Sequence, residues 1–191
     1  MAVRWSAAHR SRPRHGETAN GDSALIREDG GHTLLAVVDA LGHGPLAADA
    51  AQAALRCLEQ VPLTAGLASV LESLHQALRG GRGAAAMLAL YDGRTLRCGG
   101  VGNVELRAMG TKIPVLPTPG ILGQHVRAVR EAEVTPARGD RLVLFSDGVS
   151  SRLELELTRG LLPEAACALL LERYGRETDD ATVLVADVEN P

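Results

Sequence analysis

The sequence predicts an α+β fold, a four-layer α-β-β-α sandwich of two mainly antiparallel sheets flanked by helices. Short apolar runs separated by glycine, proline and Asp-Gly turns are typical of antiparallel strands. Three other segments repeat apolar residues at helical spacing. The resulting order is strands, two helices, many strands, one helix and one strand. Segregated runs of this kind favour an α+β fold over an alternating α/β one.

A hairpin and two helices are expected in the first half of the chain. Residues 23–39 contain two strand-like runs around the turn-forming sequence EDGG, and the second run is apolar enough to be buried on both faces. A helix then begins at Pro45, because proline is favoured at the first helical position, and it ends before Pro62. A second helix has Thr64 as its expected N-cap and ends at the glycine-rich segment 80–83.

Strands dominate the middle of the chain, and one helix and one strand follow. The expected strands are the runs 84–91, 95–101, 104–109, 127–134 and 141–145. A third helix is expected over 162–174, with Pro163 in its first turn and Gly175 after its end. The apolar run 181–188 closes the chain as a buried strand. Neither a repeat nor a linker is evident, so residues 1–191 are expected to form a single domain.

The composition argues against nucleic-acid and membrane partners. Lys+Arg 20 against Asp+Glu 23 give a net charge of −3, which denies the chain the basic surface that such partners need. With one Trp, two Tyr and one Phe, the chain lacks platforms for base stacking. Export and membrane signals are not evident either. The three widely spaced cysteines fit neither a disulfide framework nor a zinc site, so a cytoplasmic protein is expected.

Carboxylates border the apolar runs. Asp22 precedes one expected strand, Asp39 and Asp147 each follow one, and Asp179 with Asp180 precedes the last. If these strands are neighbours, the carboxylates converge at one rim of the sheets, where they cannot all stay ionised unless a cation neutralises them. Acidic oxygen ligands select Mg²⁺ or Mn²⁺, which polarise phosphate or water. Phosphate chemistry is therefore the leading hypothesis.

A simpler interpretation applies to any one of these residues. Asp and Gly are the commonest turn residues, and Asp92 and Asp140, which have no matching partner, are interpreted as turn residues. The run Gly99–Gly102 is interpreted as close strand packing, because it does not open a helix and no Gly-Lys-Ser/Thr follows it. The joint pattern of strand-end carboxylates is what favours a metal centre.

Four motifs resemble those of a known family. They are NGDS at 20–23, VVDALGHG at 37–44, LFSDGVS at 144–150 and TDDATVLV at 178–185. In this order they resemble the metal motifs of the PPM-type, metal-dependent serine/threonine protein phosphatases, in the small bacterial branch of sporulation-type and stressosome phosphatases. The resemblance spans nearly the whole chain and implies a β-sandwich flanked by helices.

The resemblance also implies a site. Asp39 would bridge two Mn²⁺ or Mg²⁺ ions, the backbone carbonyl of Ala40 would bind one of them, and Asp147 and Asp179 would complete the other site. Asp22 would hold the attacking water from behind these ligands, and two divalent ions would activate that water for direct attack on phosphorus. Whether Asp180 also binds metal is left open.

The leaving serine or threonine oxygen needs a proton, and His43 is the histidine embedded in a metal motif. A plain loop histidine in a Gly-His-Gly turn is the alternative interpretation of His43. Asn103 and Ser151 stand where many relatives carry further carboxylates, so a third metal ion is not expected. Ala40 stands where most relatives have glycine, which requires its backbone to stay in an allowed region.

The resemblance implies hydrolysis of phosphoserine or phosphothreonine in a partner regulatory protein, possibly a stressosome component, within a bacterial stress-response or sigma-factor cascade. The alternative is a catalytically weak or inactive module that keeps this fold to bind a partner in the same signalling complex. Retention of Asp39, Asp147 and Asp179 together favours the enzyme, because a binding module has no physical need for clustered carboxylates.

Overall fold

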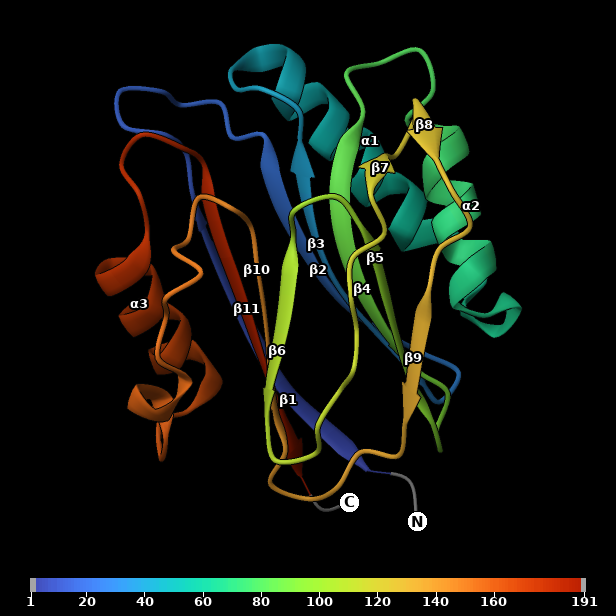
Figure 1. Ribbon diagram of the computed structural model, residues 1–191, viewed down its shortest axis with the longest axis vertical. Coiled ribbons are helices and arrows are strands. Elements are labelled where there is room, and N and C mark those ends of the chain that lie inside the picture. The colour runs from blue at the N-terminus through green and yellow to red at the C-terminus, as the bar shows by residue number, and fades with distance from the viewer. Residues whose placement is uncertain (1–2, 190–191) are drawn as a thin grey trace.

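The computed structural model describes residues 3–189 and contains two antiparallel sheets stacked face to face (Figure 1). Helices α1 and α2 cover the outer face of one sheet, and α3 covers the outer face of the other. The predicted α-β-β-α sandwich is therefore confirmed. Within residues 3–189, no helix is both long and apolar enough to cross a membrane.

One sheet has the strand order β2-β3-β4-β5-β9, and the other has the order β1-β11-β10-β6. The strands of the first are β2 (Asp22–Asp29), β3 (His32–Ala40), β4 (Ala84–Tyr91), β5 (Leu96–Val101) and β9 (Glu131–Val134). Those of the second are β1 (Arg4–Arg12), β6 (Glu105–Met109), β10 (Arg141–Phe145) and β11 (Ala181–Glu189). A small hairpin is formed by β7 (Gly120–Ile121) and β8 (His125–Val126).

The helices lie close to their predicted positions. They are α1 (Pro45–Gln60), α2 (Leu67–Ala77) and α3 (Pro163–Tyr174), with short 3-10 turns at Leu63–Ala65 and Leu155–Thr158. The prediction of Thr64 as an N-cap is wrong, because Thr64 belongs to the first 3-10 turn. Helix α2 starts instead after Gly66, whose φ of 84° is favourable for glycine and separates the 3-10 turn from the helix.

Three apolar layers explain why β3 is almost continuously hydrophobic. Alternate side chains of β3 point to opposite faces. Leu34 and Val38 pack beneath α1 and α2, whereas Leu35 and Val37 pack against the other sheet. A third layer lies between β10, β11 and α3, where Phe145 is buried. Alanine, valine and leucine fill most of this core, as the scarcity of aromatic residues requires.

Strand β1 has no counterpart in the sequence-based prediction. It pairs antiparallel with β11 along its whole length, at the edge of its sheet. Trp5 is buried, but most of the strand is polar and partly exposed, so it lacks the apolar run typical of an inner strand. The strand predicted over 127–134 is shorter than expected, because only Glu131–Val134 pairs with β5.

The topology places the strand-end carboxylates at one end of both sheets. Asp22 begins β2 and lies directly opposite Asp39, near the end of β3. In the other sheet β10 ends where β11 begins, and Ser146 N donates to the Thr182 carbonyl across that end. In Figure 1 these strand ends all lie toward the top. The convergence expected from the sequence is therefore present.

Candidate active site

A cavity of about 350 Å³ opens between the two sheets at this end. It is lined by Arg14, Asp39, Leu41, Gly42, His43, Ala85, Asn103, Asp147, Thr178 and Asp179. The structure thus brings together Asp39, Asp147, Asp179 and His43. Asp22, which is 5% exposed, is buried beside Asp39.

Asp39 is at the electrostatic centre of the cluster. Burial, and then the charges of Asp22, Asp147 and Asp179, raise the pKa of Asp39 to about 9. Its carboxyl group also lies within hydrogen-bonding reach of Asp147, so one proton can be shared between the two. At neutral pH a charged Asp39 therefore requires a cation beside it.

Asp22 is held by a network of hydrogen bonds. Ser146 Oγ donates to Asp22 Oδ2 at 2.5 Å, and Thr182 N donates to Ser146 Oγ at 3.0 Å. Burial raises the pKa of Asp22 to about 7, although the hydrogen bonds from Ser146 and Thr182 act in the opposite direction. Asp22 is therefore fixed in orientation and able to exchange a proton near neutral pH.

Asp179 and Asp180 have different surroundings. Burial and the charge of Asp147 raise the pKa of Asp179, which lines the cavity. Asp180 is 3% exposed, and its carboxylate accepts hydrogen bonds from the backbone N–H groups of Arg14 (2.8 Å) and Gly21 (2.7 Å). Asp180 thus ties the loop that precedes β2 to the start of β11, outside the set of cavity-lining carboxylates.

The sequence predicts no functional role for three residues in or beside the cavity. Arg14 lines the cavity, and its positive charge acts to lower the pKa of Asp179. Asn103 Nδ2 donates to Asp147 Oδ2 at 2.7 Å. Glu17 Oε1 lies 2.6 Å from His43 Nδ1 and orients the imidazole of that half-exposed side chain. Arg14 and Glu17 lie in an irregular polar loop that gives no periodic signal, whereas Asn103 is visible in the sequence as a departure from the family pattern.

The donor set suits a hard divalent cation. Carboxylates and backbone carbonyls are the oxygens that Mg²⁺ and Mn²⁺ prefer, and crowding of buried carboxylates is relieved by a dication. Among residues 3–189, no three acidic, histidine or cysteine side chains already stand together as a preformed metal shell. Ala40 is compatible with its expected role as a carbonyl ligand, because none of the described non-glycine residues has a positive φ.

Close packing at Gly148 leads to a stability prediction. A Cβ at this position would overlap the carbonyl oxygen of Asp180, so Gly148→Ala should push apart the two loops that carry Asp147 and Asp179. We expect the free energy of unfolding to fall by about 1–3 kcal/mol, as for other overpacked sites. Urea titration measures this change. Gly81→Ala is the control, because its new Cβ would lie 3.5 Å from the nearest atom, and equal stability of the two variants would contradict the prediction.

The fold and the site define a PPM-type serine/threonine phosphatase, and the chain is an enzyme of this class. Within the class, the family model described as Stage II sporulation protein E (SpoIIE) matches residues 29–189, and the chain belongs to that family. The resemblance seen in the sequence motifs is thereby confirmed.

Among known proteins, phosphoserine phosphatase RsbX of Bacillus subtilis (strain 168) is 27% identical over 142 residues, which cover 72% of this chain and 71% of RsbX. A solved structure described under "The bacterial stressosome: a modular system that has been adapted to control secondary messenger signaling" is 35% identical. It has a TM-score of 0.89 and covers 96% of this chain and 99% of its own. RsbX in complex with magnesium shares the fold, with a TM-score of 0.83 at 22% identity and coverage of 99% and 100%.

Proposed function

We propose that this chain removes phosphate from phosphoserine or phosphothreonine in a regulatory protein of a bacterial stress-response pathway, using two Mn²⁺ or Mg²⁺ ions. The observation that carries the proposal is the cluster of Asp39, Asp147 and Asp179 in one cavity, with the pKa of Asp39 raised to about 9. A phosphoserine phosphatase and a stressosome protein among the relatives support the substrate class and the pathway.

The proposed ligands of the ions are the carboxylates of Asp39, Asp147 and Asp179 and the carbonyl of Ala40. When bound, the two ions lower the pKa of water and neutralise charge on the phosphoryl group. Asp22, fixed by Ser146, is positioned to orient the attacking water and to accept its proton. Direct attack by water on phosphorus requires no covalent phosphoenzyme.

Two further side chains complete the proposed reaction. Arg14 lines the same cavity as the carboxylates and offers a guanidinium to the phosphoryl oxygens. His43, held through Nδ1 by Glu17, presents its other ring nitrogen for protonation of the leaving seryl oxygen. The Glu17 contact favours this role over that of a plain loop histidine, because it fixes the orientation of the imidazole.

The test is phosphate release from p-nitrophenyl phosphate and from a phosphoserine peptide, with Mn²⁺, Mg²⁺ or a chelator. We expect turnover with either ion and none with the chelator. Absence of turnover of both substrates with both ions, in a preparation whose circular dichroism shows folded protein, would contradict the proposal and favour a binding module.

Titration of activity against Mn²⁺ should fit two ions without a third activating step, since Asn103 and Ser151 offer neutral oxygens in place of carboxylates.

A further inference from the structure

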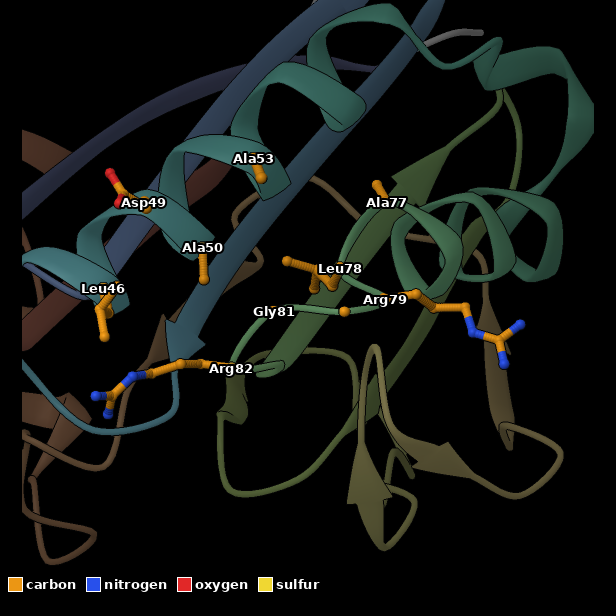
Figure 2. A pocket seen from close by; sticks show the side chains of 10 residues that line it. Leu46, Asp49, Ala50, Ala53, Ala77, Leu78, Arg79, Gly81 and Arg82 are labelled. Carbon is orange, nitrogen blue, oxygen red and sulfur yellow. The ribbon is translucent and has the colours of Figure 1, made fainter.

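A second and larger hollow, of about 500 Å³, lies between α1 and the segment that follows α2 (Figure 2). Its walls come from the first half of α1 and from residues 77–82. Ala50 and Ala53 form part of the floor, and Leu78 faces them from the other wall. Leu46, in the first turn of α1, is 59% exposed, which is unusual for a large apolar side chain on a helix that covers a sheet. We refer to this hollow as the α1–α2 groove.

Three charged residues line the α1–α2 groove: Asp49 on α1, and Arg79 and Arg82 on the segment that follows α2. Figure 2 shows the Arg82 side chain running along the groove toward the N-terminal end of α1, whereas Arg79 extends away from the groove. Arg79 Nη1 has a partner in Gln76 Oε1 at 3.5 Å. Within residues 3–189, the Arg82 guanidinium forms neither a hydrogen bond nor an ion pair. It is therefore free to bind a negative group on another molecule.

The backbone holds Arg82 beside the loop that lines the candidate active site. Gln124 Nε2 donates to the Arg82 carbonyl at 2.7 Å, and Leu41 N donates to the Gly83 carbonyl at 3.0 Å. A Cβ on Gly42 would lie 2.5 Å from Arg82 Nη1, so the guanidinium touches this loop directly. Leu41 and Gly42 also line the site cavity. Arg82 of the groove therefore lies against the loop that lines the site cavity.

We propose that the α1–α2 groove binds the segment of the phosphoprotein substrate next to its phosphoserine. One large aliphatic side chain of that segment packs against Leu46 and Leu78, and one acidic side chain pairs with Arg82. The proposal rests on the proposed function, because the phosphoserine itself must lie in the site cavity. It explains why an exposed leucine and an arginine without a partner lie in one hollow, and why that arginine also lies against the loop of the site cavity.

The test uses binding of short fluorescent phosphoserine peptides, measured by anisotropy in the absence of turnover. A leucine and a glutamate are placed at successive distances from the phosphoserine, and the glutamate is then replaced by lysine. We expect the intact protein to bind the best glutamate peptide about tenfold more tightly than its lysine counterpart, the size of one charge-assisted contact. Arg82→Gln should remove this preference and Arg82→Glu should reverse it, while Arg79→Glu should leave it unchanged.

Matched variants separate this proposal from its alternatives. Leu46→Ser should weaken binding of the leucine peptide, whereas Leu162→Ser, which alters a 75% exposed leucine at the start of α3, should not. Hydrolysis of p-nitrophenyl phosphate should be the same in the Arg82 variants and the unsubstituted protein. Equal loss of that hydrolysis would place Arg82 in the reaction centre and overturn the proposal. The absence of any preference between the peptides in the unsubstituted protein would overturn it too.

Two further outcomes test the groove proposal separately from the proposed phosphatase function. If sedimentation shows a dimer that Arg82→Glu and Leu46→Ser dissociate, the groove binds a second copy of the chain and the proposal is wrong. If no phosphoester is hydrolysed but the charge preference of peptide binding reverses as described, the groove is supported while the proposed function fails. Anisotropy and turnover therefore decide the two questions separately.

Discussion

Replacing Asp39 with asparagine should reduce Mn²⁺-dependent phosphate release by about 10³-fold or more. Asp39 is the carboxylate that faces all the others in the cluster, and its neutral amide would remove the charge that two ions share. Loss of several kcal/mol of transition-state stabilisation corresponds to this factor, since each 1.36 kcal/mol is tenfold in rate. Turnover of p-nitrophenyl phosphate and of a phosphoserine peptide measures the effect, which should be the same for both substrates.

Two variants serve as controls for Asp39→Asn. Asp29→Asn changes a carboxylate at the far end of β2, where it pairs with Arg27 at 2.6 Å, and should keep nearly full activity. Asp147→Asn should lose activity about as severely as Asp39→Asn, because Asp147 approaches the cavity from the opposite sheet. An Asp39→Asn protein that is folded and retains near-normal Mn²⁺-dependent turnover would exclude the two-ion assignment.

The position of the carboxylates could be predicted because it follows from short-range rules. The β2–β3 hairpin turns at Gly30 and Gly31, and Asp29 pairs with His32 across it. Counting equal steps away from that turn brings Asp22 opposite Asp39. The turn residues and the lengths of the apolar runs therefore determine the register of this hairpin. The way the second sheet packs against the first depends instead on the whole core.

The remaining features of the site depend on contacts between distant segments. Arg14 reaches the cavity, and Glu17 reaches His43, in a loop whose backbone is bound at Arg14 by Asp180, more than 160 residues further along the chain. Strand β1 exists because β11 pairs with it, and its polar sequence gives no apolar period. The α1–α2 groove likewise needs α1 and the segment after α2, which are separated in sequence, to lie side by side. The local conformational preferences of the residues predict none of these contacts.

Removal of divalent ions should abolish activity and make the protein's stability depend strongly on pH. Folding raises the pKa of Asp39 from 3.8 to about 9 and that of Asp22 from 3.8 to about 7. The folded chain therefore keeps protons that the unfolded chain releases above pH 3.8. The stabilisation linked to these protons is complete below that pH and is lost as the pH rises through about 7 and about 9. In a chelator, the melting temperature should fall steadily across this range.

Divalent ions and one substitution should each suppress that fall. Ions that bind only the folded chain add about 2.7 kcal/mol to the free energy of unfolding at a concentration of 100 Kd, which raises the melting temperature by roughly 5–10 °C for a chain of this size. This gain should be larger at pH 8 than at pH 5, where protons compete with the ions for the carboxylates. In the chelator at pH 8, Asp39→Asn should be more stable than the unsubstituted protein, because Asp39 must take up a proton when the chain folds at that pH, whereas the amide is already neutral. Differential scanning calorimetry with and without Mn²⁺ provides the measurement. A melting temperature that changes with neither Mn²⁺ nor pH would mean that the carboxylates do not interact. An Asp39→Asn protein that is more stable in chelator yet inactive with Mn²⁺ would show that the crowded carboxylates which destabilise the ion-free protein are also the groups that bind the ions.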